Sequence, residues 1–87
     1  MAINVRLPPM LRRDADTLVI IEPVRTIGEL VAALGRVQPG LPARLNDAIF
    51  NFAVNDEMLL HGVDRHPIKD GDVVEIVPAI SGGAYGE

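Results

Sequence analysis

One segment of the sequence has the pattern of an amphipathic α-helix, and strand patterns lie on both sides of it. Thr26 is a favourable N-cap residue, and Glu29 completes a capping box with it. Apolar residues then recur at helical spacing along one stripe, made of Ile27, Leu30, Val31 and Leu34. Because Pro39-Gly40 cannot continue a helix, we expect the helix to end between Gly35 and Gly40. The apolar stripe of such a helix must be buried against another element.

Two strands are predicted before this helix. Apolar and polar residues alternate from Ala2 to Leu7, which is the period-two pattern of a half-buried strand. Pro8-Pro9 stops that strand, and Met10 to Asp16 is expected to be a polar connection. A second strand is predicted from Thr17 to Ile21, because this stretch is rich in β-branched residues. The two strands together indicate a hairpin.

Further strands are predicted after the helix, over Ile49 to Val54, Met58 to Leu60 and Val73 to Val77. Asn55-Asp56 and Asp70-Gly71-Asp72 have the composition of turns that lead into the short strand and the final strand. A short second helical turn is expected over Pro42 to Asp47, with Pro42 near its first position.

The order of these elements predicts an α+β domain in which one main helix packs on one face of a mixed sheet of roughly four to five strands. This is the β-grasp arrangement of ubiquitin-like domains, with the first and last strands in the centre of the sheet. A ferredoxin-like α+β sandwich needs a second full helix, where only Pro42 to Asp47 is available, and periodicity alone leaves that alternative open. We assign residues 1–78 to the β-grasp domain and residues 79–87 to a flexible C-terminal arm.

The composition argues against several classes of function. The 87 residues allow one core, and the absence of cysteine excludes disulfides, thiolate zinc sites and a thiol nucleophile. The net charge is −4 and only Arg12-Arg13 cluster, so we expect no nucleic-acid partner. No apolar run is long enough to cross a membrane and no signal peptide is evident, so we expect a cytoplasmic protein without a membrane partner.

The body of the chain offers little chemistry of its own. Ser81 is the only serine, and nothing in the sequence fixes it near His61 or His66, so a catalytic triad is not expected. The two histidines lack the helical spacing of a metal-binding pair, and we predict no metal site. Phe50 and Phe52 are expected in the core or at a protein interface.

The C-terminal segment has the form of an exposed arm. The final strand ends at Pro78, which cannot donate to a sheet ladder, and Gly82-Gly83 follow shortly after it. Ragged chain ends and linkers also carry paired glycines. A Gly-Gly arm that leaves directly from a strand, however, suits a carboxyl group that is threaded through a narrow channel into another enzyme. From Ala79 to Gly83 an extended arm reaches at most about 17 Å.

The segment from Asp70 to Gly83 closely resembles the ending of the MoaD and ThiS family of ubiquitin-like sulfur carriers. Members of that family close with a Gly-Asp turn, a hydrophobic strand, a proline and Gly-Gly. The alternating first strand, the helix start Thr26 to Leu30 and the strand end Ala53 to Asn55 are similar as well. The chain length places it nearest to the molybdopterin synthase small subunit within this family.

The resemblance implies a sulfur carrier that is a protein co-substrate and not an enzyme. Gly83 would be adenylated by a ubiquitin-activating-like adenylyltransferase, converted to a thiocarboxylate, and would then give its sulfur to a sulfur-accepting synthase. ATP and magnesium would be used by the activating partner, and no cofactor would be bound by the chain itself. Ser81, Gly82 and Gly83 would enter the partner's active site. The partner interface would consist of Val77, Pro78 and Ile80, with Phe50 and Phe52 as neighbours.

The chain departs from the family pattern after the glycines. Ala79 stands where molybdopterin carriers usually have a second proline, which loosens the arm slightly. More importantly, residues 84–87 follow Gly83, so Gly83 has no free carboxylate. Some relatives carry such extensions, which a JAMM-type metalloprotease removes. We therefore expect cleavage between Gly83 and Ala84.

Two other functions remain open from the sequence. One is a protein modifier that is conjugated through Gly83 to lysines of its targets, and the other is an inert β-grasp interaction domain. The sequence also leaves open whether the sulfur acceptor is molybdopterin, cysteine, thiamine, tRNA or a secondary metabolite.

Overall fold

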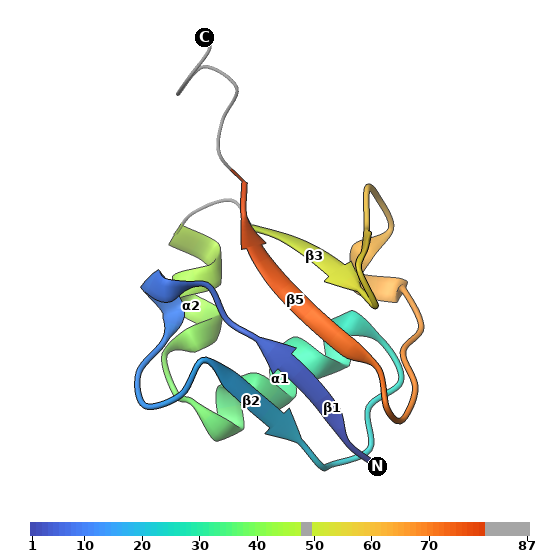
Figure 1. Ribbon diagram of the computed structural model, residues 1–87, viewed down its shortest axis with the longest axis horizontal. Helices are drawn as coiled ribbons and strands as arrows, with labels where there is room; N and C mark the ends of the chain where they lie inside the picture. Colours follow the sequence, from blue (N-terminus) through green and yellow to red (C-terminus); the bar gives the residue numbers. More distant parts are fainter. Residues whose placement is uncertain (48–49, 80–87) are drawn as a thin grey trace, which may run out of the picture.

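The computed structural model describes residues 1–47 and 50–79 of the chain, and within this part five strands form one mixed sheet in the order β2-β1-β5-β3-β4. The strands are β1 (Ile3–Arg6), β2 (Thr17–Ile20), β3 (Phe50–Val54), β4 (Glu57–Met58) and β5 (Val73–Pro78). The main helix α1 (Ile27–Val37) crosses one face of this sheet (Figure 1). The remaining elements are the second helix α2 (Leu41–Asp47) and the single 3₁₀ turns η1 (Pro9–Leu11) and η2 (Val63–Arg65).

The first and last strands lie side by side in the middle of the sheet, as predicted. β1 pairs antiparallel with β2 and parallel with β5, and β5 pairs antiparallel with β3. A parallel central pair flanked by antiparallel strands, with one main helix across it, is the β-grasp topology. The ferredoxin-like alternative is excluded, because α2 is a short seven-residue helix beside α1.

The core lies between α1 and the sheet. It is lined by alternate residues of the central strands and by the stripe of α1, among them Ile3, Val5, Ile20, Val74 and Ile76 from the sheet and Ile27, Leu30, Ala33 and Leu34 from the helix. Within residues 1–47 and 50–79, neither α1 nor α2 has the length and apolar character that a membrane crossing requires.

The capping box begins α1 where the sequence predicts it, with one difference. The Thr26 side chain accepts a hydrogen bond from the backbone N–H of Glu29 at 3.2 Å. The Glu29 carboxylate accepts from the backbone N–H of Arg25 at 2.7 Å, one residue before the N-cap. The helix then ends at Val37, within the predicted interval from Gly35 to Gly40. A side chain at Gly35 would meet Pro42 of α2, since a Cβ there would lie 2.9 Å from Pro42 Cγ.

The expectation of a purely polar connection from Met10 to Asp16 is wrong in its first part. Leu11 closes the turn η1 and is only 1% exposed, so it belongs to the core. Its carbonyl accepts a hydrogen bond at 3.0 Å from the side chain of Gln38, which is itself buried. The apolar contact of Leu11 and this buried bond together fix η1 to the end of α1.

Two strand boundaries also differ from the prediction. β2 ends at Ile20, and Ile21 is 75% exposed beyond it. The short strand lies at Glu57–Met58 instead of Met58 to Leu60, because Asn55 and Asp56 both have positive φ and turn the chain at once. Leu60 is consequently 83% exposed.

The start of β5 is tied to the neighbouring turn by a small polar network. Asp72, which is 6% exposed, accepts hydrogen bonds from the Asn55 side chain at 3.0 Å and from the backbone N–H of Lys69 at 2.9 Å. The Asn55 side chain in turn accepts from the backbone N–H of Val73 at 3.0 Å. These bonds fix the residue at which β5 begins.

Replacing Asp72 with alanine is expected to destabilise the fold by about 2 to 3 kcal/mol, because two donors lose a charged acceptor in a buried site. Urea denaturation measures this as a lower unfolding midpoint. Asp14→Ala is the matched control, since Asp14 is exposed, and its midpoint should stay close to that of the unaltered protein. Equal midpoints for both variants would contradict the role given to Asp72.

Candidate functional site

The end of β5 forms a projecting tip from which the C-terminal segment departs (Figure 1). The pairing of β5 with β1 extends to Glu75, which lies opposite Arg6. On the other side, the pairing with β3 continues to Pro78, which lies opposite Phe50. The last part of β5 is therefore held by β3 alone. This arrangement supports the strand up to Pro78, and within residues 1–47 and 50–79 no strand pairs with its other edge beyond Glu75.

The predicted contact residues are divided between the two faces of this tip. Phe50 and Phe52 are half-buried and pack against the core, on the same side of the sheet as Ile76. Val77 is half-buried on the opposite, outer face, where its neighbour across the strands is Asn51. Val77 and the two phenylalanines therefore lie on opposite faces of the sheet, because alternate residues of a strand point to opposite faces.

The other predicted site residues, Ile80, Ser81, Gly82 and Gly83, lie outside the described residues. The predicted cleavage point between Gly83 and Ala84 lies outside them as well. The structure therefore describes only the base of the site, which consists of Pro78, Ala79 and the elements around them.

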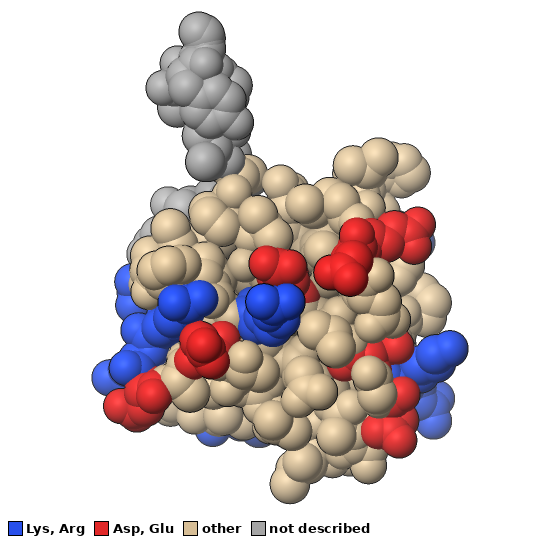
Figure 2. All heavy atoms as spheres, viewed as in Figure 1, with Lys and Arg blue, Asp and Glu red and all other residues tan. Residues whose placement is uncertain are grey.

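A group of arginines on the η1 side of the molecule was not recognised as a surface from the sequence. Arg44 of α2 donates a hydrogen bond to the carbonyl of Met10 in η1. Arg13 and Arg44 line a hollow of about 280 Å³ together with Gln38. Figure 2 shows basic side chains gathered on this side of the sheet. The sequence shows Arg12 and Arg13 as neighbours, but Arg44 is brought to them only by the contact of α2 with η1.

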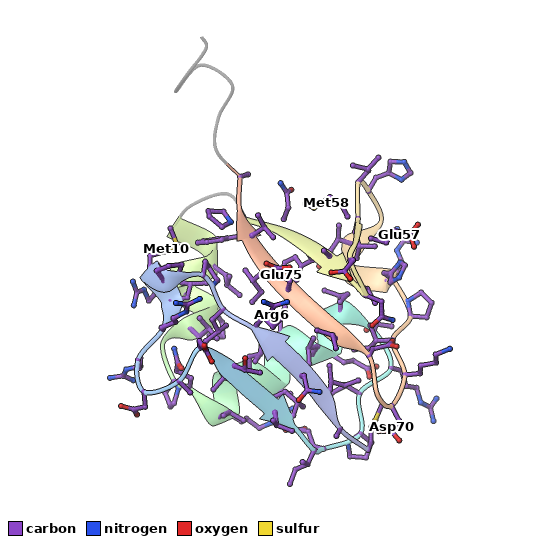
Figure 3. All side chains as sticks on the ribbon, viewed as in Figure 1. Arg6, Met10, Glu57, Met58, Asp70 and Glu75 are labelled. Atoms are coloured by element: carbon purple, nitrogen blue, oxygen red, sulfur yellow. The ribbon has the colours of Figure 1, made fainter. Side chains whose placement is uncertain are left out.

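The outer face of the sheet carries charges of both signs. Arg6 and Glu75 are cross-strand partners in the middle of this face (Figure 3). Elsewhere, Arg36 donates two hydrogen bonds to Glu22, at 3.0 and 2.6 Å. These bonds hold the pKa of the Glu22 carboxyl below its usual value and raise the pKa of Arg36. Because both side chains are exposed, this pair contributes little to stability.

The end of the sheet opposite the tip has a hollow of about 340 Å³, lined by residues that include His66, Lys69 and Asp72. Asp72 is engaged there in the network with Asn55, and the backbone carbonyl of His66 accepts from the backbone N–H of Ile27 at 3.1 Å. His61 is exposed on the loop before η2. Among residues 1–47 and 50–79, no group of three or more His, Asp or Glu side chains is arranged to hold a metal ion.

The model of the ThiS family matches residues 11–83, which includes the Gly-Gly motif. No curated protein sequence matches the chain.

Several solved structures are similar to the fold. CysO from Mycobacterium tuberculosis, described as an antigen, is 28% identical with a TM-score of 0.77, over 90% of this chain and 99% of that one. CysO in a BexX/CysO complex from Amycolatopsis orientalis is 26% identical with a TM-score of 0.76, over 94% of this chain and 100% of that one. A chain in the complex of subunits 1 and 2 of the molybdopterin-converting factor from Helicobacter pylori 26695 has a TM-score of 0.63 at 24% identity, over 95% of this chain and 100% of that one. The last similarity supports the fold alone.

The family match includes most of the chain and extends through the Gly-Gly motif. The sequence resemblance, the fold and the family model agree. This chain belongs to the ThiS family of ubiquitin-like sulfur carriers.

Proposed function

We propose that this chain is a sulfur carrier whose reactive group is the carboxylate of Gly83. The observation that carries this proposal is the tip of β5, where Pro78 is still paired with Phe50 and the Gly-Gly motif follows within five residues. The body is supported up to Pro78. The short arm that follows has no side chains at its glycines, so it suits insertion into a partner's active site.

The proposed chemistry has two steps, and both take place in the partner. A carboxylate oxygen of Gly83 attacks the α-phosphorus of ATP, and pyrophosphate leaves. A sulfide-equivalent nucleophile then attacks the carbonyl carbon, the bond to the adenylate oxygen breaks, and AMP leaves with the bonding electrons. The product is a thiocarboxylate at Gly83. ATP and magnesium are bound by the adenylyltransferase, and this chain acts as the protein co-substrate.

Processing must precede these steps, because Ala84 follows Gly83 and the Gly83 carbonyl is part of a peptide bond. Hydrolysis of the Gly83–Ala84 bond would release the carboxylate. We assign this step to a metalloprotease of the JAMM type. The carrier would then become competent for adenylation only after residues 84–87 are removed.

The partners follow from this sequence of reactions: the protease, a ubiquitin-activating-like adenylyltransferase and a sulfur-accepting synthase. The similarity to a CysO chain that forms a complex with BexX supports docking of this fold on a protein partner. We propose that the partners contact the strand tip through Val77, Pro78 and Ile80. Phe50 and Phe52 on the neighbouring strand β3 lie across from Pro78 and Ile76, on the core side of the sheet, and would adjoin this surface.

Intact-mass measurement tests the proposed function. Treatment with the cognate protease should remove the mass of residues 84–87. Subsequent treatment with the activating enzyme, ATP and a sulfur source should add the difference between one sulfur and one oxygen atom. Activation of the uncleaved chain would contradict the processing step, and no pyrophosphate exchange from the chain cleaved after Gly83 would contradict the carrier function.

Conjugates to lysines of other proteins that survive reducing denaturing gels would indicate a protein modifier instead.

Replacing Val77 with aspartate is expected to lower kcat/KM for adenylation by about tenfold or more, because a charge would be placed in the partner contact at the strand tip. Val19→Asp is the matched control, since Val19 is 50% exposed on the outer face of β2, away from the tip. Pyrophosphate exchange at several carrier concentrations measures both. An equal loss in the two variants would show that the outer face of β5 is not the contact.

A further inference from the structure

The basic side chains of this protein are almost all arginines. The sequence contains seven arginines and a single lysine, Lys69. The difference matters for a chain that carries an activated carboxyl group, because a lysine amine loses its proton readily enough to act as a nucleophile and arginine does not. Every lysine within reach of an acyl adenylate could consume it by forming an amide.

Lys69 lies at the end of the sheet opposite the strand tip. Its carbonyl accepts a hydrogen bond at 3.1 Å from the backbone N–H of Asp72, immediately before β5 begins. The same turn is joined to the start of the chain, because Gly71 donates to the carbonyl of Ala2 at 2.9 Å and Asp70 accepts from the backbone N–H of Ala2 at 2.7 Å. Asp70 marks this end of the molecule in Figure 3, and the tip of β5 lies at the other end.

The length of β5 separates Lys69 from the arm. From Val73 to Pro78 the strand advances by about 17 Å, and Lys69 lies beyond Val73. The arm from Ala79 to Gly83 spans at most about 17 Å when extended. To approach Lys69 the arm would first have to reverse its direction, and a reverse turn uses about four residues. An arm of five residues that spends about four on a turn has too little length left to return along β5 to Lys69.

The cations near the tip are arginines. Arg6 ends β1, which runs parallel to β5, so it lies toward the same end as Pro78. Arg12 and Arg13 follow η1, and Arg44 is joined to η1 through the carbonyl of Met10. These side chains supply positive charge on the tip side of the molecule without supplying an amine.

We infer that the chain keeps its side-chain amine out of reach of Gly83 so that the activated carboxyl is passed to an external acceptor and is not lost to an internal amide. This inference rests on the proposed function, because it assumes an activated Gly83. In the avoided reaction, a lysine nitrogen attacks the Gly83 carbonyl carbon, the bond to the leaving group breaks, and the amine proton passes to solvent. A lysine at position 51 would stand close to the base of the arm, since Asn51 is exposed on the outer face opposite Val77.

The chain offers a matched pair of positions for a test. Asn51 and Asn4 are both asparagines on the outer face of the sheet, and both lie beside β5. Asn51 pairs with Val77 near the tip, whereas Asn4 pairs with Val73 at the far end. A lysine at position 51 lies one strand spacing, about 5 Å, from the strand that leads into the arm. A lysine at position 4 lies at the start of β5, the same end of that strand as Lys69.

The experiment uses the chain ending at Gly83 as a thioester, prepared by intein cleavage, so that the reactive carbonyl is present without the activating enzyme. The unaltered sequence and Asn4→Lys should lose the thioester slowly, by hydrolysis to the acid. Asn51→Lys should lose it about tenfold faster or more, because the reaction is intramolecular. Its product should be a monomer lighter than the acid by one water molecule, with a rate independent of protein concentration. Peptide mapping should place the link between position 51 and Gly83.

Arg6→Lys is a second reporter, since it preserves the charge opposite Glu75 and should also give the internal amide. Far-ultraviolet circular dichroism checks that each variant is folded. An internal amide at Lys69 in the unaltered sequence would overturn the inference, and so would equal rates for Asn51→Lys, Arg6→Lys and Asn4→Lys. Because the thioester needs no ATP or enzyme, these outcomes are separate from failure of the proposed function, which would appear as absent pyrophosphate exchange.

Discussion

Strand β5 is held between β1 and β3, and its register with both strands determines where the C-terminal segment leaves the body. The polar network of Asp72 and Asn55 fixes the start of β5, and the pairing of Pro78 with Phe50 fixes its end. Between these points, Val74 and Ile76 are buried in the core beneath α1. A shift of one residue would expose both side chains and would alter the length of the arm. The arm's position is therefore stabilised by the core itself.

Much of the fold could be predicted from local patterns. The capping box at Thr26, the alternation of β1 and the Gly-Asp turn before β5 each act over a few residues, and the structure confirms the elements they predict. The errors arose where contacts between distant segments decide the outcome. Leu11 is buried beside the end of α1, where the Gln38 side chain donates a hydrogen bond to its carbonyl. That contact leaves no signal in the neighbouring sequence.

The candidate site also combines features that could be predicted from the sequence with features that could not. The Gly-Gly arm and its strand could be recognised from the sequence, because proline, glycine and an apolar run constrain local geometry directly. The division of Val77 and Phe52 between opposite faces follows from the pairing of β5 with β3. The separation of Lys69 from the tip depends on the direction of β5 relative to its turn. Both properties belong to the assembled sheet, and both bear on how an activated Gly83 would be presented.

The proposed function requires that the body supports the arm and that Gly83 carries the reactive carboxylate. The most direct measurement compares pyrophosphate exchange by the activating enzyme for chains ending at Gly83 and at Gly82, with circular dichroism as the check on folding. We predict robust exchange from the first and a loss of exchange from the second, since the shorter arm would not bring its carboxylate to the nucleotide. Equal exchange from the two chains, with both folded, would contradict the account.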